Sequence, residues 1–525
     1  MRCICLTGLF LCFLLNLTFA QLPGAVVDVR HYGFNLQLND DNNIIKGEAT
    51  VDVRYLKNSD SFSLNLVRAN KKGKGMLVSV VMENGKPVKF EQDSNNVVIY
   101  APAKRSENHS YTITYSGVPA DGLIISNNMF GHRTFFGDNW PNRAHNWLPC
   151  VDHPADKATV DFTVTAPDHY QVIANGLKVD EKQLPNHLKV TRYQEKAPVS
   201  TKVMVIGVAE FAIDHSGDVG NIPVYTYVFN DNKDAGFKSY ALAPQILQYY
   251  ISNIGPFSYE KLANVQSKTI FGGMENASCI FYFEKSVGDK GIESLMAHEI
   301  AHQWFGDAAS EKSWAHLWLS EGFATYMTDL YLERKYGVDT LKKTLQMQRR
   351  KVIAFAKRRF TPVIDSVVTD NFTQLLNANS YEKGGWVLHM LRRKLGDRIV
   401  WRSIRAYYSI YRDKNANTTD LEHVFEINSG LNLQMFFNQW LRTPGHPKLK
   451  INYDYDAAAK MLNVHIEQTQ DDVFNFPLEF SIPGTAKVFS FNIDQKIKDV
   501  QIPLSEKPTL LNIDPDTNLL FEQVN

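Results

Sequence analysis

The spacing of apolar residues changes along the chain, and it has the period of β-strands from residue 21 to about residue 212. Apolar and polar residues alternate there over the runs 26–32, 49–55 and 111–115, which is typical of strands buried on one face. The pair Asn84-Gly85 favours a tight hairpin turn between two such runs. We therefore predict an N-terminal all-β domain over residues 21–212, of the barrel or sandwich kind.

From about residue 213 the apolar residues take the three-to-four spacing of helices. After a short strand at 224–229, this spacing predicts helices over 238–254, 323–336, 341–359, 380–395 and 398–411. A further helix is expected around residues 291–305, where Gly306 is a plausible stop. A small sheet followed by a helical bundle is the second predicted domain, over residues 213–446.

The helical spacing stops at Pro444-Gly445-His446-Pro447, and strand alternation returns over 448–455, 461–467, 476–482 and 488–493. We predict a small C-terminal β-sandwich over residues 447–525. A chain of 525 residues is too long for one hydrophobic core, so a multidomain α+β fold is expected.

The first twenty residues have the organisation of a secretory signal peptide. Met1-Arg2 is basic, residues 6–15 are apolar, and Ala20 provides a small residue before Gln21. The alternative is an uncleaved anchor, but the apolar core is short for a membrane span. We predict a signal peptide over residues 1–20, cleavage near Ala20, and export to a periplasm or to the medium. No later segment predicts a transmembrane anchor in the mature chain.

Charge and cysteine content narrow the picture only slightly. Lys and Arg number 56, as do Asp and Glu, so there is no bulk charge that favours nucleic acid or an anionic membrane. Three of the five cysteines lie in the signal peptide, which leaves Cys150 and Cys279. These two either pair in an oxidising compartment or remain buried thiols. The sequence leaves this open, along with the oligomeric state.

The candidate chemistry centres on His298-Glu299-Ile300-Ala301-His302. Two histidines four residues apart lie one turn apart on the same helix face, so both imidazoles can bind one metal ion. Glu299 would act on a water bound to that metal. Glu321, nineteen residues after His302, would be the third ligand. Two imidazoles and one carboxylate leave a tetrahedral position open, which indicates a single catalytic Zn²⁺. The alternative is a buried helix with structural histidines.

A second motif, Gly272-Gly273-Met274-Glu275-Asn276, precedes the metal motif. The glycine pair would let a strand approach a bound peptide closely, and Glu275 would then meet the positive α-amine of that peptide. Alone the motif is weak, because Met82-Glu83-Asn84 occurs in the predicted hairpin as well.

Taken together, these motifs and the later Tyr381-Glu382-Lys383-Gly384 resemble the aminopeptidase N family of zinc metallopeptidases (gluzincins), whose relatives include leukotriene epoxide hydrolase. The resemblance covers residues 22–450 and implies a thermolysin-like catalytic domain. It implies His298, His302 and Glu321 as zinc ligands and Glu299 as general base. It also implies Tyr381 as the hydroxyl donor to the oxyanion. Residues Gly272, Gly273, Met274, Glu275 and Asn276 would bind the substrate, with Glu275 at its free amino terminus.

Two departures from the family stand out. Many relatives carry a Glu or Gln upstream of a segment that matches Pro149-Cys150-Val151-Asp152, and this chain has neither near Asn139 and Trp140. Either Asp138 or Asn139 takes that role, or Glu275 acts with less help; the run 138–143 either lines the site or is a buried structural loop. In addition, the large C-terminal helical domain of longer relatives is missing, with any carboxylate-binding arginine it carries.

The expected function is that of a zinc aminopeptidase acting on peptides with a free N-terminus. A zinc endopeptidase, an epoxide hydrolase of the same fold and a non-catalytic binding scaffold are the alternatives. The sequence indicates neither the preferred N-terminal residue nor the physiological substrate.

Overall fold

The N-terminal third of the chain forms paired strands, as the alternating pattern predicts. The computed structural model describes residues 24–485 and 487–525, so the predicted signal peptide lies outside the described residues. The main sheet has eight strands. In pairing order they are β13 (Leu177–Leu184), β14 (Leu188–Ser200), β11 (Lys157–Pro167), β1 (Val27–Gln37), β2 (Ile45–Tyr55), β8 (Asn108–Val118), β4 (Gly75–Glu83) and β5 (Lys86–Pro87).

The predicted hairpin joins β4 and β5, where Asn84 and Gly85 have φ values of 49° and 74°. Two smaller sheets complete this region. One contains β12 (Gln171–Ala174), β15 (Ile206–Ala209), β10 (Arg133–Gly137) and β9 (Leu123–Asn127), and the other β3 (Phe62–Asn65), β7 (Asn96–Ile99) and β6 (Phe90–Gln92).

A five-stranded sheet opens the central region and places the second motif on its edge. Its order is β16 (Phe211–Val219), β17 (Ile222–Phe229), β18 (Leu262–Ser267), β20 (Cys279–Phe283) and β19 (Gly273–Met274). The predicted change of pattern near residue 213 thus falls inside β16. The edge strand β19 runs antiparallel to β20 and presents Glu275 to the helices beside it.

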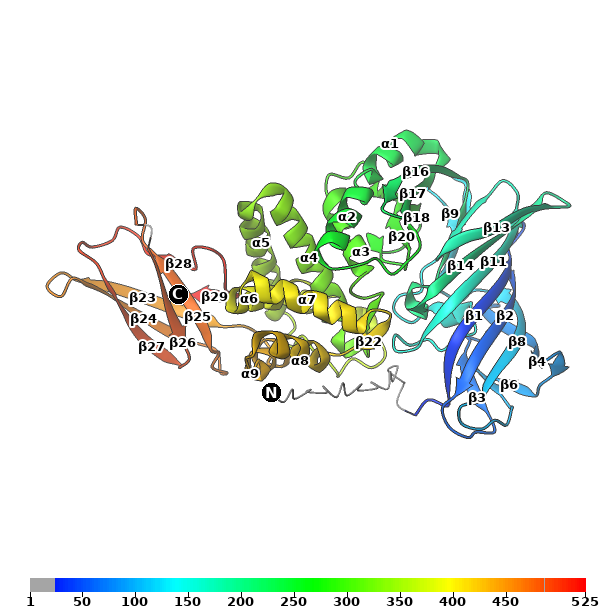
Figure 1. Cartoon of the computed structure of the whole chain (residues 1–525), viewed down its shortest axis with the longest axis horizontal. Coiled ribbons are helices and arrows are strands. Elements are labelled where there is room, and N and C mark those ends of the chain that lie inside the picture. Colours follow the sequence, from blue (N-terminus) through cyan, green and yellow to red (C-terminus); the bar gives the residue numbers. More distant parts are fainter. Residues whose placement is uncertain (1–23, 486) are drawn as a thin grey trace, which may run out of the picture.

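Nine α-helices follow or interrupt this sheet in the described chain. They are α1 (Lys233–Tyr240), α2 (Ala243–Asn253), α3 (Ile292–His302), α4 (Trp318–Tyr336), α5 (Val338–Ala356), α6 (Gly384–Leu395), α7 (Asp397–Tyr411), α8 (Thr418–Ser429) and α9 (Gln434–Phe437). Two short strands, β21 (Ala309–Glu311) and β22 (Lys414–Ala416), pair in parallel beneath them. The bundle lies between the two β regions (Figure 1).

The predicted helices differ from the observed ones in two places. The predicted helix 238–254 is two helices, because Pro244 lies in the first turn of α2, a position that proline tolerates, and the chain turns just before it. Helix α8 was not predicted. Its start is marked by a capping box, in which Asn417 and Asp420 bond reciprocally to each other's backbone nitrogens.

After the last helical turn at Arg442, the described residues form only strands and loops. One sheet contains β27 (Ile497–Pro503), β24 (Met461–Gln468), β23 (Lys448–Asp456) and β29 (Glu522–Val524), and the other β26 (Val488–Ile493), β25 (Phe476–Ser481) and β28 (Asn512–Ile513). Burial alternates along β24 and β25, so each sheet turns one apolar face inward. The predicted multidomain α+β fold is confirmed.

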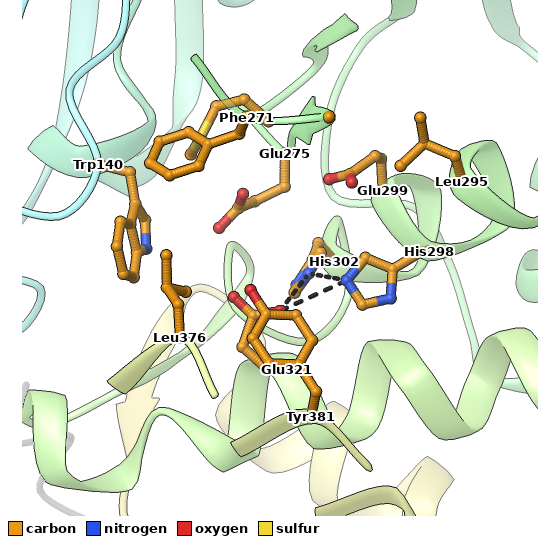
Figure 2. Close-up of a pocket in the computed structure, with 13 residues that line it drawn as sticks. Trp140, Phe271, Glu275, Leu295, His298, Glu299, His302, Glu321, Leu376 and Tyr381 are labelled. Carbon is orange, nitrogen blue, oxygen red and sulfur yellow. Dashed lines mark hydrogen bonds and ion pairs between the residues drawn. The ribbon is translucent and has the colours of Figure 1, made fainter. Parts of the chain in front are cut away.

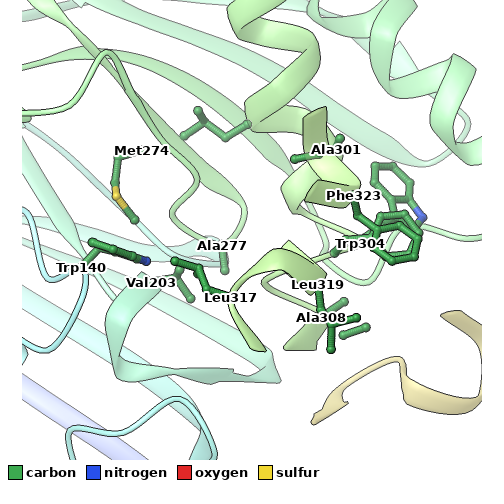
Figure 3. Close-up of a cluster of buried hydrophobic side chains, with 14 of the residues drawn as sticks. Trp140, Val203, Met274, Ala277, Ala301, Trp304, Ala308, Leu317, Leu319 and Phe323 are labelled. Atoms are coloured by element: carbon green, nitrogen blue, oxygen red, sulfur yellow. The ribbon is translucent and has the colours of Figure 1, made fainter. Parts of the chain in front are cut away.

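The apolar core continues behind the metal motif, where α3 packs against α4 (Figure 3). Ala301 of α3 and Trp304, two residues after that helix, belong to the same buried cluster as Leu319 and Phe323 of α4. The rings of Phe305 and Phe323 stack with centroids 4.5 Å apart. This packing fixes the two helices that carry the metal motif.

Two further sequence questions concern membrane anchoring and the cysteines. Among the described residues, none of the helices is both long and apolar enough to span a bilayer. Cys150 and Cys279 are buried and separate, so the structure holds them as free thiols.

Candidate active site

Helix α3 brings His298 and His302 together as the motif predicts. Their Nε2 atoms lie 3.1 Å apart. The Nδ1 atom of His302 is 3.0 Å from the carbonyl oxygen of Phe305. Because a carbonyl oxygen can only accept, Nδ1 carries the proton and Nε2 keeps a free lone pair. After His302 the chain turns back at Gly306, where φ is 119°. A Cβ at this position would collide with the hydroxyl of Ser320, so only glycine fits.

Glu321 of α4 completes a triangle with the two imidazoles (Figure 2). Its Oε2 lies 3.4 Å from Nε2 of His298 and 3.2 Å from Nε2 of His302. A tetrahedral zinc ion about 2.0 Å from each ligand requires about 3.3 Å between ligand atoms. Glu321 Oε2 is buried without another hydrogen-bond donor. The imidazole lone pairs of His298 and His302 and the carboxylate of Glu321 converge on one point. A cation at that point would offset the repulsion between them, so these residues fit Zn²⁺.

Among the described residues a second group could also gather ligand atoms, namely Glu275, Glu299 and His302. It shares His302 with the first group, and its atoms are not close enough to form ion pairs with that imidazole. The triangle of His298, His302 and Glu321 is therefore the better metal site.

Two glycines determine how Glu321 and Tyr381 meet. Gly322 of α4 and Gly384 of α6 face each other so closely that a Cβ on either would lie 2.9 Å from the Cα of the other. Tyr381 stands in the π-helical turn η7 (Asn379–Lys383) that leads into α6. Its ring stacks on that of His298, with centroids 5.9 Å apart. Burial raises the pKa of the Tyr381 phenol well above its usual value, so it is a neutral hydroxyl donor.

Glu299 lies under the edge strand rather than in open solvent. A Cβ on Gly273 would lie 2.6 Å from Cγ of Glu299, so only glycine fits there. The second glycine behaves differently, because a Cβ on Gly272 would meet nothing within 4 Å. Burial raises the pKa of Glu299 well above the usual glutamate value, which gives it affinity for a proton.

Glu275 faces the metal triangle with an incomplete set of partners. Gln303, one residue after α3, donates from Nε2 to the carbonyl oxygen of Glu275 at 2.8 Å and accepts from the backbone N–H of Ser278 at 2.8 Å. The strand is thereby tied to the metal helix. The Glu275 Oε1 atom is buried and has no hydrogen-bond partner.

A cavity of about 260 Å³ joins these groups. Its lining residues are Trp140, Phe271, Gly272, Gly273, Met274, Glu275, Leu295, His298, Glu299, His302, Glu321, Leu376 and Tyr381. Nine of the ten predicted site residues are therefore among the cavity's lining. Asn276 is the exception: it is fully buried behind the strand and does not line the cavity.

The run 138–143 contributes an aromatic wall and no replacement carboxylate. Asp138 is fully buried and accepts from the hydroxyl of Thr269 at 3.2 Å, while Arg143 pairs with it at 3.1 Å. Asn139 donates to the backbone carbonyl of Thr201 at 3.0 Å. Only Trp140 reaches the cavity. Of the two alternatives left open by the sequence, the structure favours the one in which Glu275 acts with less help, because Asp138 and Asn139 are buried on other partners and do not line the cavity.

Sequence reasoning missed most of the apolar wall. Phe271, Leu295 and Leu376 come from three separate segments, and no spacing in the sequence connects them. Phe271 alone had a signal, since it directly precedes the glycine pair.

Comparison with known proteins agrees with this geometry. Residues 29–203 match the model of the peptidase M1 N-terminal domain, and residues 240–440 match the peptidase family M1 domain. A probable aminopeptidase 2 of Sulfurisphaera tokodaii is 25% identical over 513 residues, which cover 93% of this chain and 63% of that protein. Human glutamyl aminopeptidase is 26% identical over 74% of this chain and 43% of its own length.

The fold has a counterpart among solved structures. An M1 zinc metallopeptidase from Deinococcus radiodurans superimposes with a TM-score of 0.70 at 22% sequence identity, covering 82% of this chain and 97% of that one. The chain spans only part of the length of its curated relatives. It covers 63% of the probable aminopeptidase 2 and 36% of aminopeptidase M1 of Arabidopsis thaliana. With the two family models covering both its N-terminal and its helical regions, the chain belongs to the peptidase M1 family.

Proposed function

We propose that the protein is a zinc-dependent aminopeptidase that removes the N-terminal residue from peptides. The observation that carries the proposal is the buried Oε1 of Glu275, which has no hydrogen-bond partner and lines the same cavity as the metal triangle. A peptide α-amine has a pKa of about 7.7–8.0, so it is largely cationic at neutral pH and supplies the missing donor. Because Glu275 binds that amine, the first peptide bond is placed at the metal.

In this proposal His298, His302 and Glu321 hold one Zn²⁺. The bound ion supplies Lewis acidity, which polarises the scissile carbonyl and acidifies a water. Glu299 takes the proton of the attacking water and passes it to the leaving amine, a role that its raised proton affinity supports. Tyr381 donates its hydroxyl hydrogen to the oxyanion, and one such donor contributes about 3 kcal/mol to lowering the barrier.

Three observations favour this function over the alternatives. An endopeptidase does not bind a free amine, so it would not require the buried carboxylate of Glu275. A non-catalytic scaffold would not require all three zinc ligands together with Glu299 and Tyr381. Relatives that match most of the chain carry names such as probable aminopeptidase and leucyl aminopeptidase. No residue of this site argues for epoxide hydrolysis.

The direct test is hydrolysis of an aminoacyl chromogenic amide and of the same amide N-acetylated. We expect the acetylated compound to react at least about a hundredfold more slowly, because it loses a charge-assisted contact in a buried site. Comparable rates on both would contradict the exopeptidase proposal and indicate an endopeptidase.

We also propose that the chain is exported and cleaved near Ala20, on the composition of its first twenty residues. N-terminal sequencing of the protein recovered from the medium or periplasm should begin at Gln21. Recovery of the chain only in the cytoplasm, with Met1 retained, would rule export out.

A further inference from the structure

A second cavity adjoins the active site, and Glu275 does not line it. It has a volume of about 720 Å³ and shares Leu376 and Tyr381 with the first cavity. Its remaining lining residues are Lys351, Ala354, Phe355, Arg358, Asn377, Ala378 and Glu382. They come from α5, from the turn that follows it, and from the segment before α6.

The lining residues show which part of a bound peptide each cavity would hold. Glu275 and the edge strand line only the first cavity, whereas Tyr381 lines both. In Figure 2, Tyr381 is drawn next to Glu321, whereas Glu275 lies toward Phe271 and Trp140. With the amine at Glu275 and the carbonyl near Tyr381, the residues after the scissile bond leave through the second cavity.

The second cavity contains one positive charge without a protein partner. Lys351 is neutralised by Glu382, with Nζ and Oε1 2.8 Å apart. The cations on either side of Arg358 are also paired, Lys357 with Glu522 at 2.7 Å and Arg359 with Asp365 at 2.9 Å. In the described part of the chain, Arg358 itself has no carboxylate within 4.0 Å, and it is exposed toward the cavity.

We propose that Arg358 binds the C-terminal carboxylate of short peptide substrates, so that the enzyme favours oligopeptides over longer chains. This rests on the proposed aminopeptidase function. A guanidinium offers two parallel N–H donors that match the two oxygens of a carboxylate. Such a contact selects by peptide length, because it forms only when the C-terminus reaches Arg358.

Helix geometry sets the preferred length. Glu382, next to Tyr381, contacts Lys351, and Arg358 lies seven residues further along the chain. Helix α5 rises about 1.5 Å per residue to its end at Ala356, and a turn in which the Arg358 N–H donates to the carbonyl oxygen of Phe355 continues it, which places Arg358 on the order of 10 Å beyond Lys351. An extended peptide covers about 3.3 Å per residue, so roughly three residues span that distance. Peptides of roughly four residues, one before the scissile bond and three after it, fit best.

The test compares kcat/KM for a tetrapeptide with a free C-terminus and for the same tetrapeptide amidated. We expect the wild-type enzyme to prefer the free acid by roughly three- to fivefold, as for an exposed ion pair. Arg358→Ala should abolish that preference through a higher KM for the free acid, and Arg358→Glu should reverse it. Neither change should alter hydrolysis of an aminoacyl chromogenic amide, which has no C-terminal carboxylate to bind.

A matched control is Arg350→Ala, which removes an exposed arginine of α5 that does not line the cavity. It should keep the wild-type preference. A wild-type enzyme without preference, or an Arg358→Ala variant that retains it, would overturn the inference. Failure to hydrolyse the aminoacyl amide at all would instead overturn the proposed function, and this inference with it.

Discussion

At the scale of single residues, the site depends on groups whose bonding the protein leaves incomplete. Two carboxylate oxygens, Oε2 of Glu321 and Oε1 of Glu275, are buried and receive no hydrogen bond from the protein. Leaving a charged group in this state destabilises a fold, and such groups are expected where a ligand completes them. One is completed by the metal and the other by the substrate amine in the proposed function.

The contact between Gly273 and Glu299 gives a residue-scale prediction. In Gly273→Ala the new Cβ would lie 2.6 Å from Cγ of Glu299, so the carboxylate must move. A misplacement of about 1 Å in a catalytic group costs about a hundredfold in rate, so kcat should fall by about that factor while bound zinc is retained. Steady-state kinetics and metal analysis would measure both.

Gly272→Ala is the comparison variant, since its Cβ meets nothing in the protein. It should keep most of kcat and act mainly on KM. Equal losses of kcat in the two variants would show that the Glu299 contact is not what requires glycine at 273.

The residues that sequence could identify are those within motifs. His298, Glu299, His302 and Glu321 follow from helix spacing and ligand chemistry, whereas the role of Tyr381 required the family resemblance. Asn276 shares the motif of Glu275, but it follows the edge strand β19 and is fully buried, so it does not reach the cavity. Trp140 lies in the run 138–143, whose place the sequence left open, and Leu376 reaches the cavity from a segment that no local pattern predicts.

At the scale of elements, the close crossing of α4 and α6 places Tyr381 beside Glu321. Gly384→Ala would put a Cβ 2.9 Å from Cα of Gly322, so the helices must separate. We expect a loss of about 1–3 kcal/mol in the free energy of unfolding, as for an overpacked core, together with reduced kcat. Urea denaturation and kinetics test both effects.

The neighbouring Gly385 serves as a control for this prediction. A Cβ there would lie 3.3 Å from Cγ2 of Thr325, and its next neighbours would be 3.7 Å away, at ordinary contact distance. Gly385→Ala should therefore destabilise less than Gly384→Ala. The reverse order would contradict the assigned role of the Gly322–Gly384 contact.

The contact between α4 and α5 predicts a pH dependence of stability. Asp329 is buried, its carboxylate accepts from Gln348 Nε2 at 2.9 Å, and burial raises its pKa to about 7. An unfolded aspartate has a pKa of about 3.9, so the folded state binds the extra proton between about pH 4 and pH 7. The protonated form of Asp329 is the form that the fold favours. Its contribution to the free energy of unfolding is therefore fully present below about pH 4 and is lost as the pH rises toward 7.

The variant Asp329→Asn removes this titration with little change in shape. Relative to the wild type, it should gain about 2 kcal/mol in the free energy of unfolding between pH 5 and pH 8. Denaturation at both pH values measures the difference. Parallel pH profiles for the two proteins would show that Asp329 does not titrate in this window.

Element positions were predictable where one periodicity ran uninterrupted. The predictions for α5 and α7 agree with the structure to within a few residues, because glycines with positive φ, Gly337 and Gly396, precede both helices. Helix α8 was missed although its capping residues are in the sequence. The π-helical turn that carries Tyr381 was not predictable, since its geometry is imposed by tertiary contacts.

At the scale of the whole molecule, the N-terminal β region is joined to the back of the active site by buried polar contacts. Lys202, in the turn η2 (Thr201–Val203) after β14, forms an ion pair of 2.7 Å with Glu311 of β21, and both side chains are at most 1% exposed. Lys157 of β11 donates to the carbonyl oxygens of Asp307 and Ala308 at 2.6 and 2.7 Å. The wall containing Trp140 is thereby held against the metal helix.

This arrangement predicts the effect of breaking the ion pair. Lys202→Met leaves Glu311 buried and unpaired, which should cost about 3–5 kcal/mol in the free energy of unfolding. Lys196→Met removes a comparable pair with Glu260 whose lysine is 64% exposed, and it should cost less than about 1 kcal/mol. Chemical denaturation of both variants decides; similar small losses would mean that the buried pair does not join the two regions.

The central claim is that Glu275 binds the free α-amine of the substrate, so that the first peptide bond is the one that is hydrolysed. The most direct test is kcat/KM for an aminoacyl amide and for its des-amino analogue, measured on the zinc-loaded wild type and on Glu275→Gln. The proposed function predicts about a hundredfold preference for the amine in the wild type, and little preference in the variant. Equal rates on the two substrates in the wild type, or an undiminished preference in Glu275→Gln, would contradict it.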